Sequence, residues 1–291
     1  MLKNLLRSVY YKSKGIYINL NPMYKNSIRM HWSFKDNNFG DVLNPILILF
    51  LANIKAIPIL SRYYSQEHFL VVGSILQYAT KHSIVWGSGF ISESSHCIEK
   101  PLKIHAVRGP LTRKKLIEDG IECPEVYGDP AMLLPLVYAP KIEKKYKIGI
   151  VPHYVDKNHS WIKNICDQED VLIIDVINED PLKVVDKIIS CKTIVSSSLH
   201  GLIISDAYKI PSLWIEFSGK LIGGHFKFND YYHSINYNNQ QPFIIENETM
   251  LEELLNFVEL KKIELSLQKL LLSSPFRIKK EILNKAIKHA S

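Results

Sequence analysis

The sequence has little cysteine and lacks the usual metal-binding and phosphate-binding signatures. Its 291 residues include four widely separated cysteines and no Cys-x-x-Cys pair: Cys97, Cys123, Cys166 and Cys191. This spacing argues against a zinc site or a disulfide framework and favours a reducing cytoplasm. A P-loop, a Gly-x-Ser-x-Gly elbow and an Asp-x-Asp pair are all missing. We therefore expect no metal ion, and the last absence counts against a metal-dependent sugar-nucleotide transferase.

Long hydrophobic runs are also missing. The most apolar stretch, 45–60, is interrupted by Asn53 and Lys55, so we expect no transmembrane helix. The basic N-terminal segment MLKNLLRSVYYKSKG lacks the long apolar stretch and the cleavage site of a secretory signal. We predict a cytoplasmic protein. Residues 1–14 either touch the inner face of an anionic membrane or pack on the first domain.

Acidic residues are outnumbered, with 36 Lys and Arg against 29 Asp and Glu, a net charge of +7. Such a surplus suits nucleic acid, anionic lipid or small anionic molecules. Nucleic-acid-binding proteins cluster their basic residues, often among aromatic ones, whereas here the basic residues are spread along the chain. We expect an anionic substrate and no nucleic-acid partner.

Short apolar runs alternate with helical patterns through most of the chain. Strands are predicted over 68–73, 82–87, 103–108, 124–128, 147–151, 171–176, 193–195 and 211–217. Helices are predicted over 41–53, 74–81, 110–119, 181–190 and 199–208. A lysine-rich break at 138–147 separates the two halves, and leucines recur at helical spacing from Glu246 onward. The pattern predicts an α/β fold with two Rossmann-like domains, 1–140 and 146–240, and a helical C-terminal tail, 246–291, packed on the body.

Small and polar residues stand where the predicted strands of the first half end. They are Gly73-Ser74, Gly87-Ser88-Gly89, Arg108-Gly109 and Gly128-Asp129. Any one of these junctions, taken alone, could equally be an ordinary turn. Because the carboxyl ends of parallel strands share one rim, where ligands bind, four such junctions together predict a cleft. We expect the residues at its wall to include Gly87, Ser88, Gly89 and Asp129.

The strongest local signal lies where a strand of the second half gives way to a helix. It comprises Ser196, Ser197, Ser198, Leu199, His200 and Gly201. Ser198 is a natural N-cap, and the free N–H groups and the dipole of the helix favour an anion at this turn. We predict a phosphate or carboxylate site here, with His200 beside it and Gly201 allowing close approach. The alternative is a plain N-cap with a packed histidine.

Two arginines and a histidine also stand near predicted strand ends. Arg108 and Arg113 flank the start of the helix 110–119, where their guanidinium groups can clamp a carboxylate and a phosphate; for Arg113 a solvated surface position is the alternative. His153, followed by Tyr154 and Asp156, follows the first strand of the second half. We predict that His153 acts as a base oriented by Asp156, or hydrogen-bonds a ligand.

Two further segments complete the candidate site. The stretch 223–232 reads as a glycine-hinged, polar and aromatic loop in which Lys227 suits an anion and Tyr231 suits sugar stacking. Anchoring in the core is the alternative for Tyr231. Asp41 opens the first predicted helix and either caps it or points into the cleft to accept a proton from a hydroxyl nucleophile.

The order and spacing of these motifs resemble the polysaccharide pyruvyltransferase family. The segments are GDVLNP, VVGSIL, VWGSGF, VRGPLTR, YGDPAMLLP, IGIVPHYVD, SSSLHGLIISDAY and FKFNDYY, and they run from about Asn38 to Ser234. The resemblance implies a fold like that of GT-B glycosyltransferases, with two domains facing a cleft. It also implies transfer of pyruvate from phosphoenolpyruvate, as co-substrate, to two hydroxyls of a cell-surface glycan or its lipid-linked precursor, with release of phosphate and without a cofactor.

Within this resemblance, Arg108 and His200 match the expected donor-site residues. Some members carry an arginine at the position of Ser198, so one anion contact is either missing here or supplied by Arg113 or Lys227. We expect His200 to protonate carbon 3 of the donor, and Asp41 or His153 to accept hydroxyl protons. Two other functions remain open: a glycosyltransferase that holds a sugar nucleotide in the same cleft, and a non-catalytic protein that binds glycan or phosphate.

Overall fold

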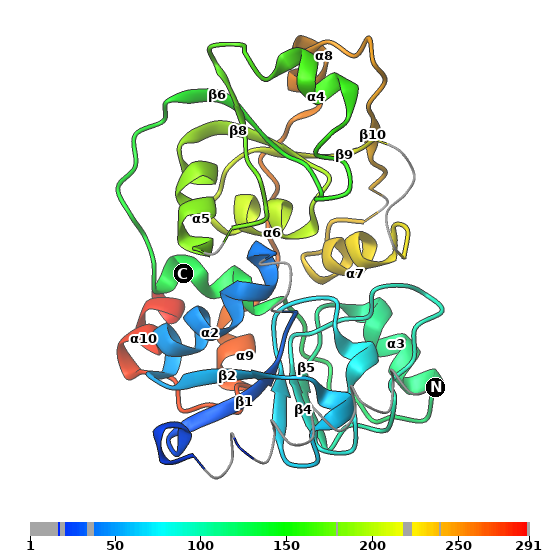
Figure 1. Ribbon diagram of the computed structural model, residues 1–291, viewed down its shortest axis with the longest axis vertical. Helices are drawn as coiled ribbons and strands as arrows, with labels where there is room; N and C mark the ends of the chain where they lie inside the picture. Colours follow the sequence, from blue (N-terminus) through cyan, green and yellow to red (C-terminus); the bar gives the residue numbers. More distant parts are fainter. Residues whose placement is uncertain are drawn as a thin grey trace.

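The computed structural model describes residue 17 and residues 21–33, 38–178, 180–217, 223–238 and 240–289. Two sheets lie one above the other along the long axis of the molecule, and helices pack on each (Figure 1). Within the described residues each sheet has five strands, and every strand pair is parallel. The predicted α/β class is confirmed. Residues 1–14, with their predicted membrane contact, lie outside the described residues.

The first sheet has the strand order β2-β1-β3-β4-β5. Its strands are β1 (Ser27–His31), β2 (Lys55–Ile59), β3 (His68–Leu70), β4 (Ser83–Trp86) and β5 (Lys103–Ala106). This half carries α2 (Phe39–Ala52), α3 (Pro110–Glu118) and the 3-10 segments η1 (Pro22–Tyr24), η2 (Ser61–Tyr63), η3 (Leu76–Tyr78) and η4 (Pro130–Leu136). The helix α3 begins at a proline and stops before Gly120, whose φ of 72° suits the end of a helix.

The second sheet has the strand order β10-β9-β8-β6-β7. Its strands are β6 (Tyr146–Val151), β7 (Val171–Ile173), β8 (Cys191–Ser196), β9 (Ser212–Glu216) and β10 (Phe243–Ile244). Its helices are α4 (Ser160–Ile165), α5 (Pro181–Ile189), α6 (Leu199–Ala207) and α7 (Phe226–Ser234). The central strands β6 and β8 are apolar and buried on both faces, as in other parallel sheets covered by helices.

A continuous apolar core joins the two halves. The helix α2 belongs to the first half in sequence but packs against α5 and η4, while η4 also packs against α6. Leu43 and Leu47 of α2, Leu133 of η4 and Ile203 of α6 are all buried in one cluster. The loops that follow the strands of the two sheets are therefore held in fixed positions opposite one another.

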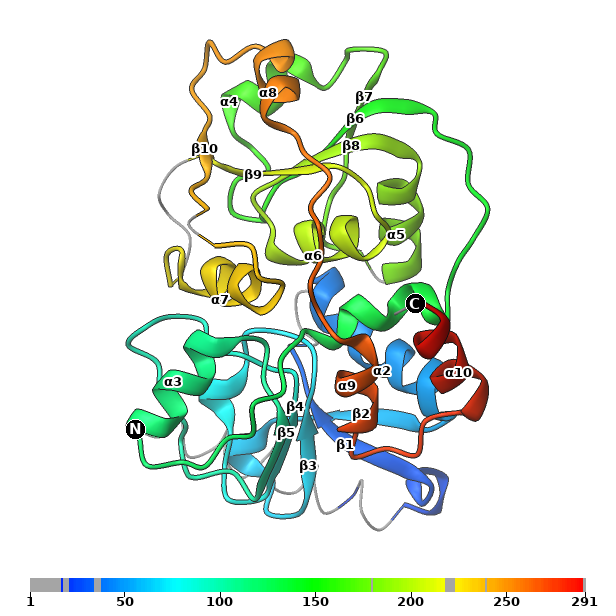
Figure 2. The ribbon, with the colours of Figure 1, turned by 180° about the vertical axis from the view of Figure 1, so that it is seen from behind.

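The C-terminal residues contact both halves in turn. The helix α8 (Leu251–Phe257) packs with the second sheet through Leu251 and Leu254. The chain then passes along the back of the molecule to α9 (Leu267–Leu272) and α10 (Lys280–His289), which lie beside the first half (Figure 2). The indole Nε1 of Trp86 donates to the Leu270 carbonyl at 3.0 Å. The tail thus covers the first sheet as well as the second.

Several predicted elements are wrong. The segment 124–128 is not a strand and makes only a single bridge, between Val107 and Tyr127. The helix predicted over 74–81 is reduced to one 3-10 turn, and the loop predicted over 223–232 contains most of α7. The aromatic residues Phe228, Tyr231 and Tyr232 form the buried stripe of that helix at spacings of three and four.

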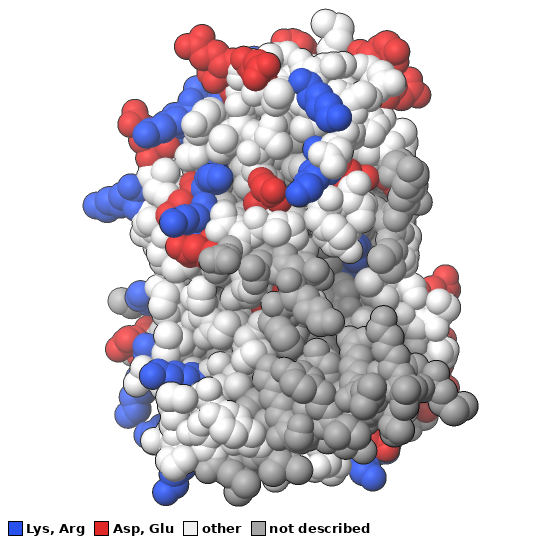
Figure 3. Space-filling model, in the orientation of Figure 1, with Lys and Arg blue, Asp and Glu red and all other residues white. Residues whose placement is uncertain are grey.

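The strands β1 and β2 were not predicted. The segment SIRMH of β1 lacks an apolar run, and β2 contains Pro58, which a strand tolerates at the edge of a sheet, where β2 lies. Among the described residues no helix is both long enough and apolar enough to cross a bilayer. On the face drawn in Figure 3 the basic and acidic side chains of the described residues are interspersed.

Candidate functional site

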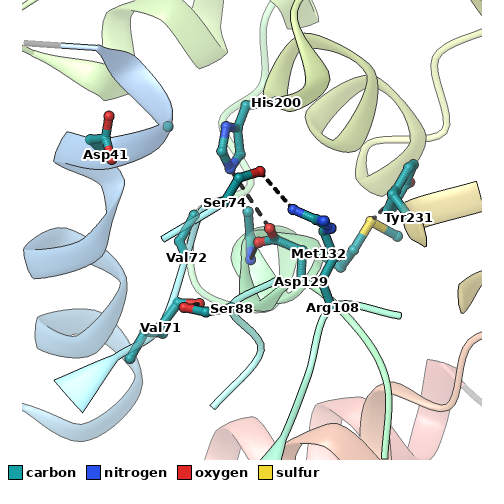
Figure 4. A network of polar contacts seen from close by, with 12 residues as sticks. Asp41, Val71, Val72, Ser74, Ser88, Arg108, Asp129, Met132, His200 and Tyr231 are labelled. Carbon is teal, nitrogen blue, oxygen red and sulfur yellow. Dashed lines mark hydrogen bonds and ion pairs between the residues drawn. The ribbon is translucent and has the colours of Figure 1, made fainter. Parts of the chain in front are cut away.

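Loops from both halves bring polar side chains together between the sheets. Ser74 follows β3, Arg108 follows β5, Asp129 precedes η4, and His200 lies in the first turn of α6. Figure 4 shows these four residues, here called the inter-sheet cluster, pointing toward one another. Arg108 and His200, which the sequence analysis assigned to one donor site, thus lie in the same region of the molecule.

Arg108 is completely buried and fully engaged. Its Nε donates to Asp230 Oδ2 at 2.9 Å, and one terminal nitrogen forms an ion pair with the same oxygen, also at 2.9 Å. The other terminal nitrogen donates to Ser74 Oγ at 2.7 Å, and the Phe90 carbonyl accepts a further bond at 2.7 Å. A Cβ on Gly89 would lie 2.5 Å from the guanidinium carbon, so the glycine leaves room for this side chain.

Asp230 is a residue of the site that the sequence analysis did not single out. Besides Arg108, its carboxylate accepts from the backbone N–H of Thr112 at 2.8 Å and from the Thr112 hydroxyl at 2.7 Å. It therefore ties α7 of the second half to both β5 and the N-terminus of α3. Its position in the segment FKFNDYY, where it was read as part of a loop, gave no sign of this partner.

His200 and Asp129 form a second buried pair. The imidazole Nε2 lies 3.7 Å from Asp129 Oδ2, and neither atom has a hydrogen-bond partner among the described residues. The other carboxylate oxygen caps η4 by accepting from the Ala131 N–H at 2.9 Å. The ring packs against the backbone of α2, because a Cβ on Gly40 would lie 2.1 Å from His200 Nδ1. At this distance the carboxylate acts on the imidazole through its charge and not through a hydrogen bond.

The serine turn before α6 uses two of its three hydroxyls internally. Ser196 Oγ donates to the Val151 carbonyl at 3.0 Å and accepts from the Ser198 N–H at 3.0 Å. Ser197 Oγ accepts from the backbone N–H of His153 at 2.8 Å. Ser198 occupies the N-cap position, but its side chain makes no capping bond. Both Ser196 and Ser197 therefore shape the turn rather than present their hydroxyls to a ligand.

The first turn of α6 leaves its own donors available. The backbone N–H groups of Leu199, His200 and Gly201 donate to no group among the described residues. The reason for glycine at position 201 is packing, since a Cβ there would lie 2.3 Å from Ser196 Oγ. The group that approaches Gly201 closely is thus Ser196 at the end of β8, and the glycine does not leave open space for a ligand.

Two basic side chains stand near this turn. His153 is buried with its Nδ1 unbonded among the described residues. Burial, together with the charge of Lys227, lowers the pKa of His153 to about 4. Burial, together with Arg108, lowers the pKa of Lys227 to about 8. Lys227 therefore lies close enough to His153 and to Arg108 for the charges to interact. Within the described residues no carboxylate forms an ion pair with its ammonium group.

The remaining residues of the strand-end rim are structural. Ser88 is fully buried, and its hydroxyl donates to the Val71 carbonyl at 2.9 Å. Gly87 has a φ of 91°, and a Cβ there would lie 2.2 Å from Pro130. The carboxylate of Asp129, by contrast, is directed at His200 (Figure 4).

Four predicted site residues lie elsewhere or remain apart from the inter-sheet cluster. Tyr231 is fully buried and its hydroxyl donates to Asp206 at 2.9 Å, so it is anchored in the core, the stated alternative to stacking on a sugar. Arg113 Nε donates to the Cys123 carbonyl at 3.1 Å. Tyr154 packs its ring on that of His153 and is 40% exposed. Asp41 lies on α2, outside the polar contacts drawn in Figure 4.

The described residues contain no group of three or more His, Cys, Asp and Glu side chains placed to hold a metal ion. The polar chemistry of this region therefore consists of two buried pairs, Arg108 with Asp230 and His200 with Asp129, the buried ammonium of Lys227 and the free N–H groups of α6. Cationic groups and N–H donors of this kind bind a carboxylate or a phosphate.

Comparison of the sequence with known proteins identifies its family. The model of the polysaccharide pyruvyl transferase family matches residues 8–219, so it begins before the Asn38 boundary of the motif series and ends before the segment FKFNDYY. The uncharacterized protein L143 of Acanthamoeba polyphaga mimivirus is 31% identical over 246 residues, which cover 80% of this chain and 85% of that protein.

A second relative carries a role in its name. The succinoglycan biosynthesis protein ExoV of Rhizobium meliloti (strain 1021) is 33% identical over 209 residues, which cover 69% of this chain and 62% of that protein. The family match spans more than half of the chain and contains the whole inter-sheet cluster. The family is that of a transferase in polysaccharide biosynthesis. We conclude that the chain belongs to the polysaccharide pyruvyl transferase family.

Proposed function

We propose that the protein transfers pyruvate from phosphoenolpyruvate to two hydroxyls of a sugar, forming a cyclic ketal and releasing phosphate. The acceptor is a cell-surface polysaccharide or its lipid-linked precursor, used in the cytoplasm at the inner face of the membrane. The observation that carries the proposal is the pairing of His200 with Asp129 beside the cationic group of Arg108 and Lys227. The family and the similarity to the succinoglycan biosynthesis protein ExoV also support the proposal.

The donor would lie between the two sheets, that is, between the proposed domains 1–140 and 146–240 in a GT-B-like arrangement. Phosphoenolpyruvate carries a carboxylate and a phosphate, and both need positive charge or N–H donors. Lys227 and the first-turn N–H groups of α6 supply direct contacts. Arg108 is buried, so we assign it to positioning Ser74 and to the electrostatic field of the site.

In the proposed reaction His200 donates a proton to carbon 3 of the enol. Positive charge then develops at carbon 2, where the first sugar hydroxyl adds and loses its proton to a base. The bond from carbon 2 to the phosphate oxygen breaks, and the second hydroxyl adds to the same carbon and loses its proton. His153 is neutral at pH 7 because its pKa is near 4, so its ring can accept a proton. Asp41 remains the second candidate base.

A glycosyltransferase that uses a sugar nucleotide is the alternative. The same N–H groups of α6 would then hold a diphosphate. The two functions differ in their products, since pyruvyl transfer releases inorganic phosphate and glycosyl transfer releases a nucleotide.

The decisive experiment incubates the protein with phosphoenolpyruvate and candidate lipid-linked saccharides, and follows the saccharide by mass spectrometry. We expect one saccharide to gain the pyruvyl mass while phosphate is released in equal amount. His200→Ala should reduce turnover by about 10²–10⁴-fold, the usual worth of a general acid. The matched control is His96→Ala, whose side chain is 60% exposed and which should keep wild-type turnover. Near-normal turnover of His200→Ala would remove the acid assignment.

A further inference from the structure

A cavity lies between the two halves, lined by residues of α3 and α7. It has a volume of about 600 Å³, within the range of small-molecule sites. One wall comes from α3, with Lys114, Lys115 and Glu118, and the loop residue Glu93 adds to it. The opposite wall comes from the end of β9 and the start of α7, with Glu216, Gly223, Gly224, His225, Phe226 and Asn229.

The floor of this cavity carries a carboxylate–imidazole pair. His225 Nε2 lies 2.5 Å from Glu216 Oε2, and the His225 side chain is still 37% exposed. The ring also makes an edge contact with Trp214, with the centroids 4.9 Å apart. Both side chains are therefore held in place, and the His225 side chain is the more exposed of the two.

The charges around the cavity are mixed. Three carboxylates, of Glu93, Glu118 and Glu216, face two ammonium groups, of Lys114 and Lys115. An anionic ligand needs a surplus of positive charge, which this lining does not offer. Carboxylate oxygens, an imidazole and the Asn229 amide are instead suited to the many hydroxyls of a neutral sugar.

The helix α7 connects this cavity to the proposed donor site. Phe226 and Asn229 line the cavity, whereas Lys227 and Asp230 on the same helix face Arg108. Glu216 ends β9, whose neighbour β8 ends at the serine turn. A saccharide in the cavity would thus lie one helix away from the donor.

We propose that this cavity, with Glu216 and His225 at its floor, binds hexose units of the saccharide acceptor. That the bound saccharide is an acceptor rests on the proposed function, but saccharide binding itself can be measured without phosphoenolpyruvate. Figure 1 shows the location, where α7 of the upper half meets α3 of the lower half.

The test measures binding of the full-length protein to an array of immobilised hexose oligosaccharides of two to four units, without phosphoenolpyruvate. We expect the wild type to bind at least one of them, and His225→Ala and Glu216→Gln each to weaken that binding at least tenfold. The control is His233→Ala, a histidine near the other end of α7 that does not line the cavity. Thermal unfolding of each variant checks that the fold is kept, and two variants are used in case one fails to fold.

The outcomes separate this inference from the proposed function. Saccharide binding that depends on His225 and Glu216, without any phosphate release from phosphoenolpyruvate, would support the cavity and contradict pyruvyl transfer. Pyruvyl transfer by the wild type, with an unchanged KM for the acceptor in both folded variants, would overturn the cavity assignment. The assignment would equally be overturned if no oligosaccharide bound the wild type. In active variants the KM for phosphoenolpyruvate should stay within about twofold of the wild type.

Discussion

Lys227 is a buried ammonium beside a buried guanidinium, an arrangement that favours an anion between them. The exposed fraction of Lys227 is 7%, and the pKa of its ammonium is lowered to about 8 by burial and by Arg108. In a site without ligand this lysine loses its proton near pH 8, whereas an ordinary lysine stays charged beyond pH 10. A donor with two acidic groups would restore the balance of charge.

This residue makes the affinity for the donor depend on pH. Because only the protonated amine attracts the anion, kcat/KM for phosphoenolpyruvate should fall about tenfold per pH unit above pH 8. Lys227→Arg keeps its charge over this range and should remove that decline, although its larger head group alters the absolute rate. The measurement is the pH profile of kcat/KM from pH 6.5 to 9.5. A wild-type profile that is flat up to pH 9.5 would contradict the role of Lys227.

Individual site residues could be predicted only in part. His200 and Asp129 stand at strand or helix ends, and this local signal is sufficient to predict that they lie at the rim between the two halves. The partner of Arg108 was missed because Asp230 is far away in the sequence and lies in a segment that was read as a loop. For Tyr231 the sequence left sugar stacking and anchoring in the core both open, because the partner Asp206 that stabilises the buried position belongs to a different helix.

At the level of elements, the first turn of α2 packs closely against His200 of the other half. A Cβ added at Gly40 would overlap the His200 ring, so Gly40→Ala must push the imidazole away from Asp129. Alanine is a better helix former than glycine, so we expect circular dichroism to show α2 retained while kcat falls at least tenfold. Leu49→Ala, at an exposed position of the same helix, is the control and should leave kcat unchanged. A fully active Gly40→Ala would show that the position of the ring does not matter.

The tail is attached to the first sheet by an aromatic group. The ring centroid of Phe276 lies 4.7 Å from that of Phe69 and 6.0 Å from that of Trp86. Phe276→Ala should lower the free energy of unfolding by about 3 kcal/mol, as for other buried phenylalanines. Urea unfolding measures this loss, and the 55% exposed Phe257 provides the control variant, for which we expect a much smaller change. Equal stability of the two variants would mean that the tail adds nothing to this core.

Elements with a clear sequence signal were predicted well. Strands β3 to β6 and β8 are short apolar runs next to small residues, and α3 has proline at its start and glycine beyond its end. The pattern failed where long-range packing decides. The polar strand β1 is stabilised by two neighbours in the sheet, and α7 depends on burial of its aromatic stripe beneath the second sheet. Single-sequence patterns carry no information on such partners.

At the scale of the whole molecule, two buried histidines make stability depend on pH. His31 Nδ1 accepts from the Ser61 N–H at 3.0 Å, and His68 Nε2 bonds to Ser83 Oγ at 2.8 Å. Burial, with a smaller effect of His68, lowers the pKa of His31 to about 3, and burial lowers the pKa of His68 to about 4. Both rings are therefore held neutral inside the fold.

Because the folded pKa values lie below the unfolded value of about 6.5, the unfolded chain binds protons first as pH falls. The stability contributed by each neutral ring is complete above pH 6.5 and is lost between pH 6.5 and the folded pKa. We expect the free energy of unfolding to drop by about 2 kcal/mol per histidine between pH 7 and pH 5. Urea titrations at the two pH values measure it, and His68→Gln should remove roughly half of the part due to this pair. A pH-independent stability over this range would contradict the burial of both rings.

The attachment of α9 and α10 to the first sheet has a consequence for synthesis on the ribosome. The indole N–H of Trp86 donates to the Leu270 carbonyl and to the Ser273 hydroxyl, and the Leu51 carbonyl accepts from the N–H of Lys279. These partners leave the exit tunnel long after the elements they stabilise. The nascent first half must therefore keep an incomplete core until α9 and α10 have been translated, and during this interval chaperones would have most to protect.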